Sequence, residues 1–221
     1  MSASLQFSKH MQALFFQGKQ FDPWALEWMR AEQLPADLTP IEVLAALRWL
    51  FREGGGRGVP IAVIGPNNAN PEQLALAERL GKRLGEIRIP ILCGGKSGVM
   101  EAVCKGCHDA GGLSIGMLPD NEWTAANAYV SLPLATGLGP ARNAIIARAA
   151  FALIAIGGGY GTLSEMAFGM HFGRLVLAVA DAPELPGVVR CASLDEALER
   201  VAARLLRLDV DQPDLVTKAR S

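Results

Sequence analysis

The feature that most constrains the fold of this chain is a series of short segments that are apolar throughout and alternate with segments of helical pattern. A strand with one face in solvent alternates apolar and polar side chains, so a strand without that alternation is covered on both faces. Helices on both faces of a parallel sheet provide such cover. The expected strands are residues 61–65, 89–95, 113–118, 152–158 and 175–180, and the expected helices are residues 71–86, 97–110, 139–150, 161–171 and 193–208. Residues 59–221 are therefore predicted to form an α/β domain with a doubly wound, mainly parallel, Rossmann-like sheet.

The preceding residues 1–58 show a different pattern. Asp22 and Thr39 each precede a proline, and a capping residue followed by proline is typical of a helix start. We therefore expect residues 1–58 to be an N-terminal helical extension that packs on the main domain, although their sequence indicates no role for them. The two expected helices are residues 22–33 and 39–53, and a glycine-rich breaker follows at residues 54–60.

The charge balance excludes several classes of partner. The 221 residues include 21 basic and 22 acidic side chains, for a formal net charge of −1, which supplies no field to hold nucleic acid or an acidic membrane surface. No apolar segment reaches the roughly 20 residues that a membrane-spanning helix needs, and residues 1–20 lack the pattern of a secretory signal. We expect a cytoplasmic protein that holds any phosphate locally.

Two segments have the form of phosphate-binding turns, ILCGGKSGVMEAV at 91–103 and IAIGGGYGTLSEMA at 154–167. In each, an apolar strand runs into glycines and then into a helix. Glycine lets the backbone turn tightly against a ligand, and the helix N-terminus behind it favours an anion. Neither segment has the Walker or the full dinucleotide spacing, so we expect one phosphate at each turn. The candidate binding residues are Gly94, Gly95, Lys96, Ser97, Gly98 and Met100 in the first segment, and Gly157, Gly158, Gly159, Tyr160, Gly161 and Thr162 in the second.

Two charged residues accompany these turns. Arg142 opens the expected helix 139–150, where a cation is unfavourable unless an anionic partner is near. Glu165 lies one turn into the helix after the second glycine segment. An acid at that place also complements the helix dipole by about 0.3–1 kcal/mol, which explains it without any ligand.

The segment CKGCH, residues 104–108, matches the motif for covalent attachment of haem c. That motif implies export, which residues 1–20 do not support. Cys104 and Cys107 lie three positions apart on an expected helix, where small thiols pack well in a core. A zinc site needs about four ligands, and the sequence offers no second Cys/His pair at ligand spacing. We therefore predict neither a metal nor a cofactor.

Together, GGKSGVMEA, Arg142 and GGYGTLSE resemble the LONELY GUY (LOG)-like Rossmann-fold nucleotide-binding proteins over about residues 60–182. Such proteins have been labelled lysine decarboxylases, but Lys96 and Lys105 lack the context of a pyridoxal-anchoring lysine. Gly157 stands where LOG enzymes usually have proline, and Asn143 stands where lysine usually follows the arginine. These departures fit a bacterial branch to which the molybdenum cofactor carrier proteins are also similar.

The resemblance implies a nucleoside 5′-monophosphate phosphoribohydrolase, which releases a free base and ribose 5-phosphate without metal or redox cofactor. By that analogy Gly158, Gly159, Gly161 and Thr162 hold the 5′-phosphate. Glu165 engages the ribose and the hydrolytic water, and Arg142 assists at the scissile bond. The resemblance also implies a homodimer or a higher homo-oligomer.

Two other hypotheses remain open on the sequence. A carrier of a nucleotide or of the molybdenum cofactor would use the same turns to hold a phosphorylated ligand unchanged. An oligomeric interaction module would keep the turns only as vestiges. The sequence does not identify the base or the phosphorylated ligand.

Overall fold

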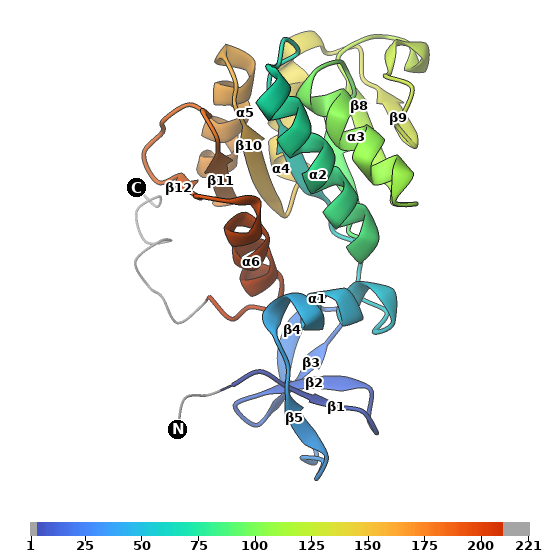
Figure 1. Cartoon of the computed structure of the whole chain (residues 1–221), viewed down its shortest axis with the longest axis vertical. Coiled ribbons are helices and arrows are strands. Elements are labelled where there is room, and N and C mark those ends of the chain that lie inside the picture. Colours follow the sequence, from blue (N-terminus) through green and yellow to red (C-terminus); the bar gives the residue numbers. More distant parts are fainter. Residues whose placement is uncertain (1–3, 210–221) are drawn as a thin grey trace. The chain divides into compact units, whose positions relative to one another are not determined.

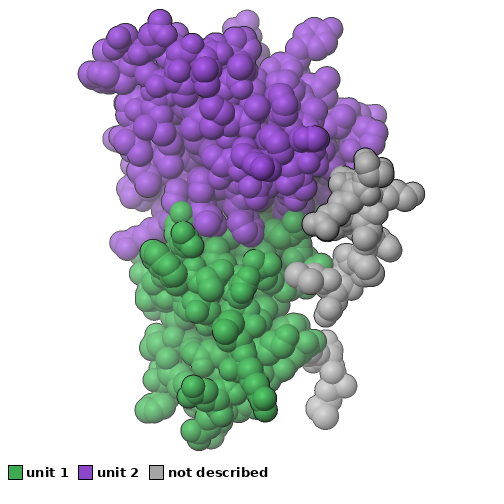
Figure 2. All heavy atoms as spheres, turned by 180° about the vertical axis from the view of Figure 1, so that it is seen from behind, with its two compact units in different colours: residues 1–58, 198–213 green, residues 59–197, 214–221 purple. Residues whose placement is uncertain are grey.

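The computed structural model describes residues 4–209, which divide into two compact units (Figure 2). One unit contains the chain up to Gly58 and the segment that begins at Leu198, and the other contains Val59–Ala197. We describe each unit by itself, beginning with the one that carries the glycine turns.

The unit Val59–Ala197 is built on a seven-stranded sheet with the order β12-β11-β10-β6-β7-β8-β9. Every neighbouring pair of strands in it is parallel. The strands are β6 (Ile61–Ile64), β7 (Ile91–Cys93), β8 (Ser114–Leu118), β9 (Leu132–Ala135), β10 (Ala152–Ile156), β11 (Leu175–Val179) and β12 (Val189–Arg190). The predicted doubly wound, Rossmann-like α/β fold is thereby confirmed.

Helices cover both faces of this sheet (Figure 1). Helices α2 and α3 pack together over one face, and α4 and α5 pack together over the other. The helices of this unit are α2 (Pro71–Ile87), α3 (Val99–Asp109), α4 (Arg142–Ala149) and α5 (Tyr160–His171), and the short 3₁₀ helices are η1 (Trp123–Ala125) and η2 (Gly139–Ala141). Helix α6 (Leu194–Leu205) begins in this unit and belongs to the other unit from Leu198 onward. None of the helices within residues 4–209 is long and apolar enough to cross a bilayer.

The central strands β6, β10 and β11 are buried along their whole length, because both of their faces lie under helices. Burying one such aliphatic side chain contributes about 1.5–3 kcal/mol, so the alternation of apolar strands and amphipathic helices is sufficient to drive this layering. One core cluster lies in this unit and contains Ala62, Ile64, Leu92, Ile146, Ala147, Ala150, Leu153, Ala155, Met166, Val176, Ala178 and Ala182.

The other unit contains a five-stranded antiparallel sheet, a helix that follows these strands in the chain, and the part of α6 from Leu198 onward. Its strand order is β4-β3-β2-β1-β5. The elements are β1 (Gln6–Ser8), β2 (Ala13–Phe16), β3 (Lys19–Asp22), β4 (Glu27–Arg30), β5 (Leu38–Pro40) and α1 (Val43–Arg52). The helix expected over 39–53 is thus present as α1, with a later start.

The helix expected over residues 22–33 was wrong, and so was the description of residues 1–58 as helical. The Asp22 carboxylate does accept hydrogen bonds from the amides of Trp24 (2.8 Å) and Ala25 (2.9 Å), as an N-cap would. The chain then reverses through Leu26, at a φ of 56°, into β4. There Trp28 packs edge-on against Phe21, with ring centroids 4.8 Å apart. This tertiary packing outweighs the weak local preference for a helix.

Helices α2 and α3 approach so closely that two glycines are required between them. A methyl group on Gly106 would overlap the backbone carbonyl oxygen of Glu78, and one on Gly81 would overlap that of Val103. Backbone atoms within two packed helices cannot move aside as a flexible side chain can. The pair α2–α3 therefore depends on glycine at both positions.

We predict that Gly106→Ala destabilises the protein by about 1–3 kcal/mol, because the added methyl group forces two helix backbones apart. Urea unfolding would measure the change as a lower midpoint with an unchanged slope. Gly161→Ala is the control, since a methyl group there meets no heavy atom within 4 Å and should leave the midpoint nearly unchanged. Equal midpoints for Gly106→Ala and the wild type would contradict the close approach of the helices.

Candidate functional site

The two glycine turns lie at the carboxyl edge of the parallel sheet. From β6 the chain proceeds through β7 to β8 and β9, whereas β10 leads through β11 to β12 on the other side. The carboxyl ends of β6 and β10 therefore flank the point where the strand order reverses, which is where open α/β sheets bind ligands. One glycine turn follows β10, and the other follows β7.

The turn after β10 contains three consecutive glycines, of which Gly159 is exposed. Gly157 and Gly158 have φ values of 58° and 141°, which a residue with a side chain rarely adopts. Gly159 is the N-cap of α5 and makes no side-chain capping hydrogen bond, and both it and Gly161 are exposed. The first amides of a helix have no partner within the helix, so this terminus suits an anion.

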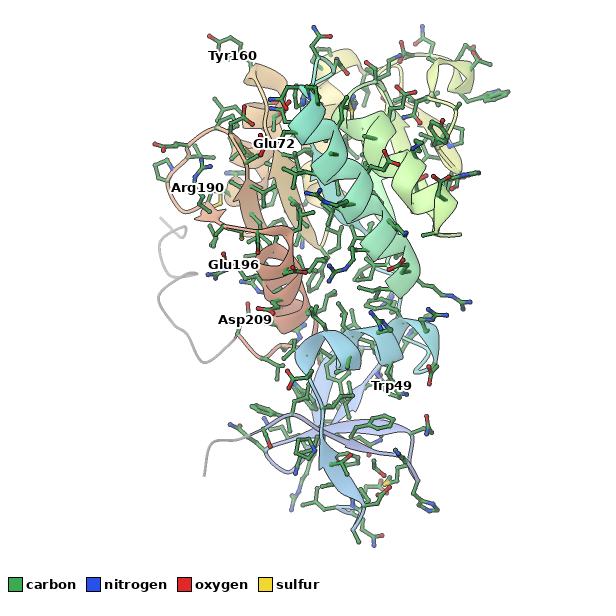
Figure 3. All side chains as sticks on the ribbon, in the orientation of Figure 1. Trp49, Glu72, Tyr160, Arg190, Glu196 and Asp209 are labelled. Atoms are coloured by element: carbon green, nitrogen blue, oxygen red, sulfur yellow. The ribbon has the colours of Figure 1, made fainter. Side chains whose placement is uncertain are left out.

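The other two predicted residues of this turn differ in exposure. Tyr160 is 92% exposed and projects outward from the start of α5 (Figure 3). Thr162 is only 3% exposed, and its side chain packs against Gly158. A ligand at the turn would thus meet the backbone and the tyrosine before it met the threonine.

The turn after β7 packs against the backbone of the loop that follows β6. A methyl group on Gly98 would overlap the carbonyl oxygens of Pro66 and Asn67, and the amide of Val99 donates to Pro66 O at 3.1 Å. The loop that follows β6 therefore lies directly on the start of α3. Gly98 serves this close approach.

The remaining predicted residues of the first segment point in several directions. Lys96 donates from Nζ to Asp120 Oδ2 at 2.9 Å and to the carbonyl oxygen of Ala125 at 3.1 Å. Its charge is therefore already paired within this unit. Met100 is buried, and its sulfur lies close to Gly94, whereas Ser97 is exposed.

Arg142 connects the two turns. It is the first residue of α4, its side chain is only 9% exposed, and it donates from Nη2 to the carbonyl oxygen of Gly94 at 3.3 Å. Its Nη1 lies 3.5 Å from Oε1 of Glu165 on α5 and donates to Asn143 Oδ1 at 2.6 Å. Among the described residues, Arg142 Nε is buried without a hydrogen-bond partner.

Asn143 completes the link to α5. Its side-chain amide donates to Ser164 Oγ at 2.9 Å and to the carbonyl oxygen of Gly161 at 3.4 Å. Ser164 in turn donates to the same carbonyl oxygen at 2.7 Å. Two consecutive residues of α4 therefore hold both glycine turns at one edge of the sheet.

Burial shifts the pKa values of both Arg142 and Glu165. The Glu165 side chain is 7% exposed, and burial raises the pKa of Glu165 to about 8, although the Arg142 charge opposes this shift. Burial also lowers the pKa of Arg142, which the Glu165 carboxyl opposes. At neutral pH Glu165 is therefore mostly a neutral acid that can donate a hydrogen bond. The guanidinium beside it lacks a full counter-charge.

Two residues near the turns were not among the predicted site residues. Gln73, on the first turn of α2, donates from Nε2 to Oδ1 of Asp181 at 2.8 Å, and both side chains lie beside Gly157. The sequence contained signals for both. Gln73 lies three residues after its capping Asn70, and Asp181 follows an apolar strand almost directly.

The cysteines of the CKGCH segment lie in the core. Cys104 and Cys107 are fully buried on α3, which confirms the prediction that they pack as small apolar side chains. Cys104 Sγ lies 3.5 Å from the sulfur of Cys93, and all three thiols are free. Within residues 4–209 no group of three or more His, Cys, Asp or Glu side chains is arranged to hold a metal ion.

The doubly wound sheet, the glycine turns at its carboxyl edge and the arginine and glutamate between them define a Rossmann-like protein of the LOG type. The chain belongs to the SLOG cluster4 family, whose model matches residues 42–203. The resemblance predicted from the glycine motifs is confirmed.

Solved structures extend this comparison. The molybdenum cofactor binding protein of the phototrophic bacterium Rippkaea orientalis is 31% identical, with a TM-score of 0.63 over 66% of this chain and 97% of that protein. The molybdenum cofactor carrier protein of Chlamydomonas reinhardtii is also 31% identical, with a TM-score of 0.62 over 67% of this chain and 99% of its own. An uncharacterised protein of Archaeoglobus fulgidus is 36% identical over 138 residues, which are 62% of this chain and 91% of the relative.

The raised pKa of Glu165 predicts a specific pH dependence of stability. A folded-state pKa of about 8, against an ordinary value of 4.5, means that the folded protein binds the proton more tightly than the unfolded chain does. The resulting stabilisation is complete below about pH 4.5 and is lost as the pH rises through about 8.

We therefore expect the wild type to lose stability between pH 5 and pH 8 relative to Glu165→Gln, which has no proton to release at this position. Urea unfolding midpoints of both proteins at unit steps of pH would measure the difference. Parallel curves for the two proteins would show that Glu165 titrates normally.

Proposed function

We propose that this protein binds a phosphorylated small molecule at the glycine turns and holds it without hydrolysing it. The observation that carries the proposal is the buried guanidinium of Arg142, which faces a mostly neutral acid and leaves Nε without a partner among the described residues. A buried charge without compensation is costly, and an anion at the site would compensate it.

The start of α5 offers the second half of such a site. Residues 159–161 are exposed, no side chain caps the helix there, and the helix dipole favours negative charge at this end. The Asn143 side chain donates to the carbonyl oxygen of Gly161 at this terminus, and Asn143 directly follows Arg142 in the chain. A phosphoryl group at the Gly158–Thr162 turn would lie at the positive end of α5, in the same network as the guanidinium.

Carriage is favoured over hydrolysis by the state of Glu165. Cleavage of a glycosidic bond develops positive charge on the sugar, which a carboxylate stabilises. The Glu165 side chain is 7% exposed and burial raises its pKa to about 8, which disfavours the carboxylate form that this stabilisation needs. The similarity to molybdenum cofactor carrier and binding proteins over nearly their full length also supports carriage. We propose a phosphorylated fused-ring heterocycle, a pterin or a purine nucleotide, as the ligand.

A phosphoribohydrolase is the second candidate, because Arg142 and Glu165 do lie together beside the glycine turn, at 3.5 Å. In this candidate the resemblance to LOG enzymes assigns the ribose and the hydrolytic water to Glu165 and the scissile bond to Arg142. Glu165 would have to lose its proton when substrate binds.

We further propose that the protein acts in the cytoplasm as a homo-oligomer. Ile145 and Phe168, on the paired helices α4 and α5, are 39% and 38% exposed, which supports a covered surface there. Sedimentation velocity of the purified chain measures the assembly, and a single monomeric species would contradict it.

We predict that AMP at about 100 times its dissociation constant stabilises the wild type by roughly 2.7 kcal/mol. Gly161→Asp should abolish this effect, because its carboxylate would occupy the start of α5 and repel the phosphate. The position is open and has no positive φ, so the variant should fold. Gly161→Asn is the matched control of equal size without charge. Thermal unfolding with and without AMP measures the stabilisation of the wild type and of both variants.

Incubation of the protein with AMP distinguishes the carrier from the phosphoribohydrolase. Under the carrier proposal, chromatography detects no free adenine after prolonged incubation of AMP with the wild type. Release of adenine by the wild type and its loss in Glu165→Gln would overturn carriage in favour of the hydrolase. If AMP, ribose 5-phosphate and methyl phosphate all fail to stabilise the wild type, the phosphate site itself is wrong.

A further inference from the structure

A second carboxylate lies at the carboxyl edge of the sheet, and neither the predicted site nor the proposed function uses it. Asp181 follows β11, the strand next to β10, and is exposed. Its Oδ1 would lie 3.2 Å from a methyl group on Gly157, the first glycine of the turn after β10. In contrast to the buried Glu165, this carboxylate is open to solvent.

The α2 side of the turn holds Asp181 in place through Gln73. The Gln73 side chain donates from Nε2 to Asp181 Oδ1 at 2.8 Å and accepts from the Asn70 amide at 3.0 Å. The Gln73 amide in turn donates to Asn70 Oδ1 at 2.9 Å. Gln73 is 6% exposed, so it is locked between the start of α2, the glycine turn and Asp181.

Arg190 holds Asp181 from the other side. Its guanidinium donates to the carbonyl oxygens of Ala180 (2.9 Å) and Ala182 (2.7 Å), the two neighbours of Asp181 in the chain. Ala180 has a φ of 52°, an unfavourable conformation for alanine that these contacts maintain. Arg190 lies on β12, where it pairs with Ala178 of β11 (Figure 3). The carboxylate is therefore presented by a rigid turn.

A carboxylate beside a phosphate site repels the phosphate unless the ligand brings a hydrogen-bond donor to it. Gln73 engages Oδ1 of Asp181, and an ionised carboxylate has further acceptor sites on both oxygens. The group attached to the phosphate of a sugar or nucleotide carries hydroxyl donors close to the phosphoryl group. A charged acceptor strengthens a hydrogen bond from such a hydroxyl.

We propose that Asp181 is a specificity-determining residue that accepts a hydrogen bond from a hydroxyl of the group esterified to the bound phosphate. The protein thereby selects phosphate esters of polyhydroxylated compounds over simple phosphates, and Gln73 is the positioning residue. This inference rests on the proposed phosphate site at the glycine turn. It assigns recognition of the hydroxyl group to the exposed Asp181 rather than to the buried Glu165.

The test compares ribose 5-phosphate with methyl phosphate, which has the same phosphoryl charge and no hydroxyl. Calorimetric titration of the wild type should show tighter binding of ribose 5-phosphate. In Asp181→Asn the ratio of the two affinities should fall about tenfold, because the side-chain amide replaces an acceptor oxygen with a donor. Affinity for methyl phosphate should be unchanged or higher, since a negative charge is removed.

Asp181→Asn retains an oxygen that can accept from Gln73, so its melting temperature should match that of the wild type. Glu184→Gln is the matched control, because it removes the same charge from an exposed position in the same loop. It should leave the affinity ratio unchanged. If both phosphates bind and Asp181→Asn keeps the wild-type ratio, the inference is overturned while the phosphate site stands. If neither phosphate binds to the wild type, the proposed function fails and the inference fails with it.

Discussion

The candidate site depends on the interactions that the buried guanidinium of Arg142 makes. It lies at the start of α4 and joins the carbonyl oxygen of Gly94, the side chain of Asn143 and the carboxyl group of Glu165. A cation at this depth is unfavourable in solvation terms and also unfavourable at a helix start. Its contacts join the turn after β7 to α4 and α5, and its Nε is buried without a hydrogen-bond partner among the described residues.

Two acidic residues near the carboxyl edge of the sheet, Glu165 and Asp181, differ in their exposure to solvent. Glu165 is buried under the turn and shares its surroundings with Arg142, and burial keeps its proton in place near neutral pH. Asp181 is exposed, its carboxylate accepts from the neutral side chain of Gln73, and Arg190 donates to the backbone carbonyl oxygens of its two neighbours. Two carboxyl groups of nearly the same chemistry therefore differ in their environment, because burial disfavours the charged form of one and solvent surrounds the other.

Much of the larger unit could be predicted from the sequence because its signals are local. Apolar runs gave β6, β10 and β11, and the glycine segments marked the starts of α3 and α5. The short edge strands β9 and β12 were missed, since an edge strand has little buried surface to mark it. The helix predicted after Asp22 failed for a related reason. Its capping signal is real, but the same hydrogen bonds also serve a turn, and the packing of Trp28 on Phe21 selects the strand.

The sequence by itself determined the class of the fold and the two glycine turns, and it indicated Arg142 and Glu165 as candidate site residues. These features depend on hydrophobic periodicity and backbone requirements, which are properties of residues close together in the chain. Only the tertiary structure decided that Lys96 pairs with Asp120, that Glu165 is buried with a raised pKa, and that Gln73 and Asp181 lie beside Gly157. These facts depend on residues far apart in the chain. Burial and charge are properties of what surrounds a side chain, so they exist only once the strands are assembled.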